Sequence, residues 1–193
     1  MIFMSMKEAF DFFFEEMTDN FLKKRGKKPF AYCDEKNRPT GLFLMETLNA
    51  GGYAEWKPKL QDHPVSFDNI EQLLGFSIHP QIKSYFSTYW FLPLEATYHL
   101  NQKEIDFCII GINQYSSLET IIKDNFNFEG AHYLSDHNYF LLGSYCNIDG
   151  NDSYLVEVNN ETGEVMAVEV QEKKSIKLAD SIEELLKNMK GIW

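Results

Sequence analysis

Apolar and polar residues follow a helical period over the first part of the chain. Ser5 is followed three positions later by Glu8, which is the pattern of a capping box at the start of a helix. Large apolar residues then recur at helical spacing, at Phe10, Phe13, Phe14, Met17 and Phe21. The residues between them are mostly acidic, and Gly26 ends the pattern. This segment predicts an amphipathic helix with an acidic outer face.

The next part of the chain changes from irregular to helical. Residues 30–52 are rich in turn-forming residues, and 53–57 read as a short strand. Ser66 is the expected cap of a helix that continues to Leu74. His79 and Pro80 predict the start of a further helical segment.

From Leu94 the apolar period becomes two, which is typical of strands. Residues 94–100 and 104–112 predict one hairpin, and Gly163 suits the loop of a second between 154–158 and 164–170. The remaining expected elements are a helix that starts at Ser116 or Ser117, a strand over 139–148 and a closing helix over 178–189. This order predicts an α+β fold, a mainly antiparallel sheet flanked by helices, in one domain over 1–193.

The net charge of the chain limits the kinds of molecule that it can bind. The chain has 18 basic and 29 acidic side chains, a formal net charge of −11. Such a field repels nucleic acid and attracts basic protein surfaces. The longest apolar run is too short to cross a bilayer, so we expect no direct membrane insertion. Three widely spaced cysteines, outside any metal or disulfide pattern, fit a cytoplasmic location.

The chain contains few candidates for chemistry. His132, Asp136 and His137 lie close together and could form a small hydrolytic or metal site, but they do not share a helix face. Cys146 lies in an apolar strand with no activating group. Phosphate-binding loops and catalytic signature motifs are missing from the sequence. We therefore expect a binding protein, without enzymatic activity, metal or cofactor.

Acidic side chains are the remaining candidates for a functional surface. They occur in the first helix, around the second helix and along the first hairpin, at Glu15, Glu16, Asp19, Asp62, Asp68, Glu71, Glu95, Glu104 and Asp106. Solvated acids of this kind are common on protein surfaces. Their number nevertheless predicts an acidic surface that binds a partner.

Two blocks of sequence resemble a known family. Residues 54–58, Ala-Glu-Trp-Lys-Pro, and 69–88, Asn-Ile-Glu-Gln-Leu-Leu-Gly-Phe-Ser-Ile-His-Pro-Gln-Ile-Lys-Ser-Tyr-Phe-Ser-Thr, are similar to the Syd family of SecY-interacting proteins. The segments 161–165 and 178–186 look alike too. The resemblance implies a compact α+β protein of the wider SUKH group that needs no cofactor.

The resemblance also implies a partner and a place. Syd proteins are expected to bind the basic cytosolic loops of the SecY translocation channel through an acidic concave surface, peripherally on the cytoplasmic side of the plasma membrane. Glu71 lies in the matching block and is the first expected contact, with Asp68 beside it. The SUKH group also contains immunity proteins, so neutralisation of a protein toxin is the alternative.

Overall fold

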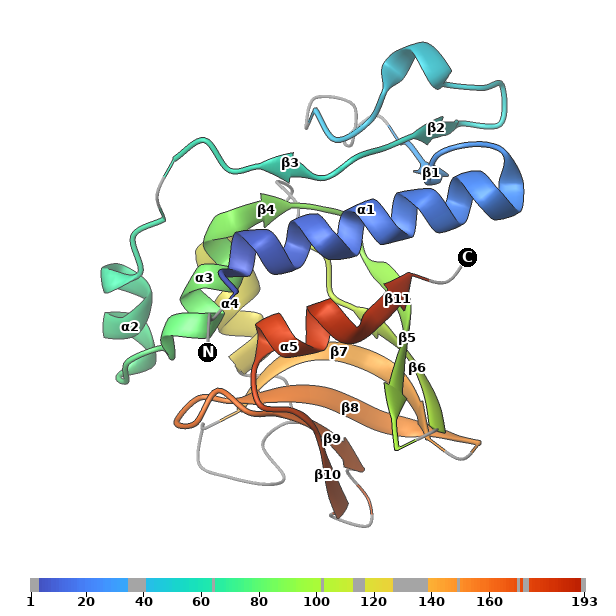
Figure 1. Ribbon diagram of the computed structural model, residues 1–193. Coiled ribbons are helices and arrows are strands. Elements are labelled where there is room, and N and C mark those ends of the chain that lie inside the picture. The colour runs from blue at the N-terminus through green and yellow to red at the C-terminus, as the bar shows by residue number, and fades with distance from the viewer. Residues whose placement is uncertain are drawn as a thin grey trace.

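The computed structural model describes residues 4–34, 41–63, 65–101, 103–112, 117–126, 139–148, 150–169, 171 and 174–191. Its centre is an antiparallel seven-stranded sheet with the strand order β10-β9-β8-β7-β6-β5-β11 (Figure 1). The strands of this sheet are β5 (Leu94–Leu100), β6 (Lys103–Ile109), β7 (Tyr139–Ile148), β8 (Asn151–Asn159), β9 (Val165–Glu169), β10 (Lys174–Ala179) and β11 (Met189–Gly191). The α+β prediction is confirmed.

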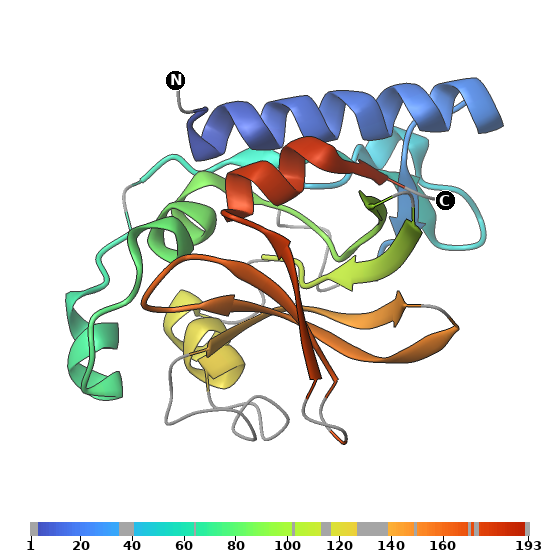
Figure 2. The same ribbon diagram turned by 60° about the horizontal axis from the view of Figure 1, so that its bottom comes forward.

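Helices and two small strand pairs surround the sheet. The helices are α1 (Met6–Arg25), η2 (Met45–Thr47), α2 (Asp68–Leu74), α3 (Pro80–Thr88), α4 (Leu118–Phe126) and α5 (Ile182–Asn188). The pairs join β1 (Phe30–Tyr32) to β2 (Tyr53–Glu55) and β3 (Lys59–Leu60) to β4 (Tyr89–Trp90). Helices α1 and α5 lie side by side in both Figure 1 and Figure 2.

Helix α1 forms for the reasons visible in its sequence. The Ser5 and Glu8 side chains make the reciprocal capping-box bonds, and Gly26 ends the helix in a left-handed conformation with φ of 68°. The apolar stripe is buried against the rest of the molecule. At Gly191 a Cβ atom would lie only 2.7 Å from Cγ of Met17, so the close approach of α1 to edge strand β11 requires glycine.

Aromatic rings from α1, α3 and the following segment form much of the core. The ring centroid of Phe10 lies 5.4 Å from those of Phe14 and Tyr85, and 5.3 Å from that of Phe91. All four side chains are buried. The buried Tyr85 hydroxyl donates a hydrogen bond to the carbonyl of Ile110 at 3.1 Å, which satisfies its polar atom.

Most of the predicted elements are confirmed, with shifts at their ends. The strand over 139–148 and the two hairpins are present, although the second strand of the first hairpin ends at Ile109. Beyond it, Gly111 packs against the Leu92–Pro93 peptide, where an added Cβ atom would lie 2.5 Å from the nitrogen of Pro93. Helix α4 begins after Ser117, whose Oγ accepts from the amide of Thr120 at 3.1 Å.

Three local predictions were wrong. Helix α2 is preceded by Phe67, and Ser66 is not its cap. Residues 30–32 are not irregular, because they pair with β2 as strand β1. The segment 178–189 is not one helix. Residues 178 and 179 end β10, α5 covers Ile182–Asn188, and Met189 begins β11. Local apolar spacing suggested one helix, whereas cross-strand pairing decides both ends.

Candidate protein-binding surface

The nine acidic residues predicted for the binding surface fall into three groups. Glu15, Glu16 and Asp19 lie on α1; Asp62, Asp68 and Glu71 lie on α2 or before it; and Glu95, Glu104 and Asp106 lie on the β5–β6 hairpin. Figure 1 and Figure 2 place α2 and the hairpin at opposite ends of the molecule. The nine acids therefore do not form one continuous patch.

The β5–β6 hairpin gathers its three carboxylates on one face. Glu95 lies opposite Cys108, Thr97 lies opposite Asp106, and His99 lies opposite Glu104. Paired residues project to the same side of a sheet, so Glu95, Glu104 and Asp106 share a side and all three are exposed. The intervening residues of both strands point to the other side and are mostly buried; on the acidic side Thr97 is buried as well, whereas the three carboxylates are exposed. We call these three residues the hairpin acid face.

The carboxylates of the hairpin acid face are only lightly engaged. The Oδ1 atom of Asp106 accepts a hydrogen bond from the Thr97 hydroxyl at 2.7 Å. Glu104 lies 4.0 Å from Nε2 of His99, and its side chain is 73% exposed. A carboxylate with this exposure keeps most of its hydration and can meet a cation from another molecule at little cost.

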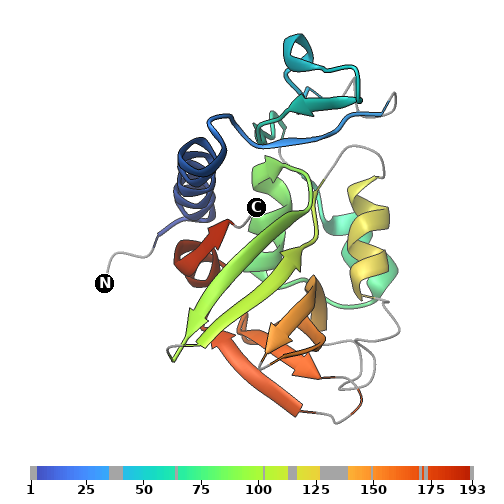
Figure 3. The ribbon, with the colours of Figure 1, turned by 90° about the vertical axis from the view of Figure 1, so that its right-hand side faces the viewer.

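A hollow borders the hairpin acid face on the side of α1 and β11. It is lined by Asn20, Lys24, Thr97, His99, Glu104, Lys190 and Gly191. Figure 3 shows the hairpin in front and α1 to one side of it. Because Lys24 and Lys190 are basic, the hollow carries mixed charge, and the hairpin acid face has a basic border.

Glu71 lies in a different environment. Its Oε1 atom is 2.6 Å from Nζ of Lys83 and accepts a hydrogen bond from the amide of Ile78 at 2.7 Å. The Lys83 contact, followed by the Ile78 bond, lowers the pKa of Glu71. Only 20% of its side chain is exposed. Glu71 thus connects α2 to the start of α3 and is already paired inside the molecule.

The other predicted acids remain on the surface. Asp68 opens α2 and is exposed, and Asp62 is 3.9 Å from the Lys59 ammonium. On α1, Glu15 and Asp19 are exposed, whereas Glu16 is half-buried. The acidic residues on α1 and around α2 therefore form two groups that are separate from the hairpin acid face.

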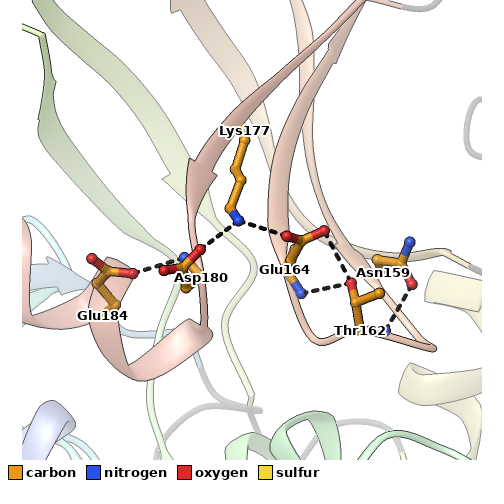
Figure 4. A network of polar contacts seen from close by, with 6 residues as sticks. All are labelled: Asn159, Thr162, Glu164, Lys177, Asp180 and Glu184. Carbon is orange, nitrogen blue, oxygen red and sulfur yellow. Dashed lines mark hydrogen bonds and ion pairs between the residues drawn. The ribbon is translucent and has the colours of Figure 1, made fainter.

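The sequence reasoning missed a further acidic cluster near α5. Lys177 contacts the carboxylates of Glu164 and Asp180 (Figure 4). Both contacts raise the pKa of Lys177, and the contact with Asp180 has the larger effect. Oε2 of Glu184 accepts from the amide of Asp180 at 2.7 Å, while Oγ of Ser181 accepts from the Glu184 amide at 3.0 Å. The Ser-x-x-Glu spacing is a helix-start signal that could have located this cluster. The cluster links the segment between β8 and β9 to β10 and α5.

The residues considered for catalysis give no active site in the described part of the chain. His132, Asp136 and His137 lie outside the described residues. Burial raises the pKa of the Cys146 thiol to about 12, so it stays protonated and unreactive at neutral pH. Within the described ranges, no three His, Cys, Asp or Glu side chains converge as metal ligands would.

Glu157 is an unusual buried acid. It is fully buried in β8, and neither carboxyl oxygen has a hydrogen-bond partner within the described structure. Its cross-strand neighbours are Leu141 and Met166. Burial raises its pKa to about 7, because the apolar surroundings disfavour the charged form.

The fold and surface define an α+β antiparallel-sheet protein with an exposed acidic hairpin. Among the described helices, none has the length and apolar character to span a bilayer. The family model described as Syd protein (SUKH-2) matches residues 7–109, more than half of the chain. The chain belongs to the Syd family.

Three relatives extend the similarity beyond the matched segment. Protein Syd of Alteromonas mediterranea is 26% identical over 144 residues, which cover 75% of this chain and 76% of the relative. Protein Syd of Shewanella pealeana is 22% identical over 95% of this chain and 81% of the relative. Protein Syd of Shewanella frigidimarina is 23% identical over 96% of this chain and 82% of the relative.

Proposed function

We propose that the protein binds the basic cytosolic loops of the SecY translocation channel and acts there in regulation or quality control. The observation that carries the proposal is the register of the β5–β6 hairpin, which presents Glu95, Glu104 and Asp106 together to solvent in a protein of net charge −11. Membership of the Syd family supports the choice of partner. Binding at these loops would hold the protein peripherally on the cytoplasmic side of the plasma membrane.

Electrostatics explains how such a contact would form. The net charge of −11 produces a field that steers a Lys/Arg-rich loop toward the protein and raises the rate of encounter. Carboxylates on the hairpin acid face can then pair with the arriving cations without first breaking strong internal bonds. Glu71 is a poorer contact, because a partner would have to compete with Lys83 and with the Ile78 amide. The hairpin is therefore the proposed primary contact, with the acids of α1 and α2 contributing to the field.

The proposal can be tested with purified SecY in lipid nanodiscs. The double variant E95K/E104K reverses two exposed charges and leaves the Asp106–Thr97 hydrogen bond intact. The matched control E119K/D124K makes the same charge change on exposed positions of α4. We expect E95K/E104K to slow association by about tenfold or more, and the control to cause a smaller loss.

Two results would count against the proposal. One is equal affinity of the wild type and E95K/E104K for SecY. The other is equal loss in both double variants, because that would assign the effect to net charge and not to the hairpin. Capture of a toxin-like protein without SecY from extracts of the native host would favour the immunity alternative.

A further inference from the structure

The end of α1 carries a concentration of positive charge in an acidic protein. Five basic residues occupy positions 23–28, interrupted only by Gly26. All five are exposed: Lys23, Lys24, Arg25, Lys27 and Lys28. None of them makes an ion pair with a described acidic residue. They account for five of the 18 basic side chains, so this end of the molecule differs in sign from the protein as a whole.

Exposed aromatic rings lie next to these charges. In the β1–β2 pair, Tyr32 lies opposite Tyr53, and Phe30 is two positions before Tyr32 on the same side. The Tyr53 ring centroid is 5.7 Å from that of Tyr32 and 6.1 Å from that of Phe30. Tyr32 and Tyr53 are 58% and 43% exposed, although large aromatic side chains usually bury more of their surface.

The basic and aromatic groups meet at Lys27 and Phe30. The Lys27 ammonium lies 3.8 Å from the centroid of the Phe30 ring, and Phe21 of α1 packs edge-on against Phe30 at 6.4 Å. The Tyr32 ring is held close to Gly52, where an added Cβ would approach it to 2.7 Å. Figure 1 shows the end of α1 beside β1 and β2. We call this surface, positions 23–28 with the three rings of β1 and β2, the basic–aromatic end.

Acidic residues are also present there, but they are fewer. Glu55 is half-buried and lies opposite Phe30, while Asp34 and Glu46 are exposed nearby in sequence. Asp19, exposed on α1 one turn before Lys23, is a fourth acid, so five bases against four acids leave a small positive local balance. At physiological ionic strength, charges farther than about 8 Å are largely screened, so the local balance decides what a surface can approach.

We propose that the basic–aromatic end docks on the anionic head groups of a lipid bilayer. Lysine and arginine clusters are attracted to anionic leaflets, and tyrosine rings favour the head-group region, where the ring meets apolar chains and the hydroxyl meets water. A nucleic acid would also attract the lysines, but the net charge of −11 opposes an extended polyanion that passes over the acidic faces. This inference does not depend on the SecY contact.

The two proposed surfaces are neighbours. Lys24 belongs to the basic–aromatic end and also lines the hollow beside Glu104 of the hairpin acid face. A molecule resting on lipid through the first surface would hold the second close to the membrane surface, where cytosolic loops of a channel emerge. Lipid contact would thereby raise the effective concentration of the protein at its partner.

The test is co-sedimentation of the full chain with vesicles that contain no protein. The vesicles are made of phosphatidylcholine alone or of phosphatidylcholine mixed with phosphatidylglycerol, in about 0.1 M salt. We expect binding to the mixed vesicles only. K23E/K28E should lower the bound fraction at least about tenfold, whereas the matched control K123E/K187E, on α4 and α5, should leave it nearly unchanged.

A second variant separates the aromatic contribution. Y32S/Y53S keeps every charge and should weaken binding to the mixed vesicles while preserving its salt dependence. The proposal is overturned by absence of binding to the mixed vesicles, by equal binding to both vesicle types, or by equal loss in K23E/K28E and K123E/K187E. None of these results depends on SecY, so this test and that of the proposed function fail independently.

Discussion

The α2–α3 connection and the β5–β6 hairpin both present acidic residues, yet they use them differently. Oε1 of Glu71 in α2 is 2.6 Å from Nζ of Lys83 in α3 and accepts a hydrogen bond from the Ile78 amide. Its charge is therefore already paired in a contact that joins the two helices. Glu104 of the hairpin is 73% exposed, with His99 4.0 Å away. An acidic residue is therefore available to a partner only where the fold has not already paired it.

The largest expected effect comes from a third environment, the buried Glu157, which has no hydrogen-bond partner among the described residues. Its pKa is raised from 4.5 to about 7 in the folded protein, so the folded state binds this proton more tightly than the unfolded state. The stability that Glu157 contributes is therefore fully present below pH 4.5, falls between pH 4.5 and 7, and is lower by about 3 kcal/mol above that range. E157Q should remove this slope and unfold at higher denaturant concentration than the wild type at pH 8.

Chemical unfolding of both proteins from pH 5 to 8 measures this effect, with E104Q as the control at an exposed position. An unchanged pH slope in E157Q would show that Glu157 is ionised or solvated in the folded protein, and would contradict its assigned environment.

The paired carboxylate should matter less. E71Q removes the ion pair with Lys83 and weakens the bond to Ile78, and is expected to lower the free energy of unfolding by about 1–2 kcal/mol, because the site is partly exposed. A double-mutant cycle with K83M isolates the pair. Additive losses in that cycle would mean that Glu71 and Lys83 do not interact, and would return Glu71 to the candidates for partner binding.

Helix α1 offers the same contrast within one element. S5A removes the N-cap side chain that accepts from the Glu8 amide, and should cost about 1 kcal/mol. E15Q, on the exposed side of the same helix, should be nearly neutral. Thermal unfolding of the two variants compares them directly, and an equal loss would mean that the outer acids of α1 also support the fold.

The smallest effect on stability is expected at the hairpin acid face. E95Q/E104Q should change the free energy of unfolding by less than about 0.5 kcal/mol, because the two carboxylates make no strong internal contact. Denaturant midpoints of the variant and wild type provide the measurement. A loss above about 1 kcal/mol would show that these residues have a structural role that their exposure conceals.

Sequence patterns predicted the elements whose signals are local. The Ser5–Glu8 capping box and the period-two hairpins are written in neighbouring residues, so α1, β5–β6 and β8–β9 could be expected. The extent of α5 could not, because strands β10 and β11 depend on pairing with β9 and β5, far away in the sequence. Glu71 appeared free for the same reason: Lys83 approaches it only once α3 has packed.

A charge exchange between the two proteins can show whether SecY loops contact the hairpin acid face itself. Affinity for SecY would be measured for the wild type and E95K/E104K, each against unmodified SecY and against SecY with acidic substitutions in its basic cytosolic loops. We expect each single-sided change to weaken binding and the combination to restore part of the affinity. Purely additive losses, with no recovery in the combination, would contradict this contact.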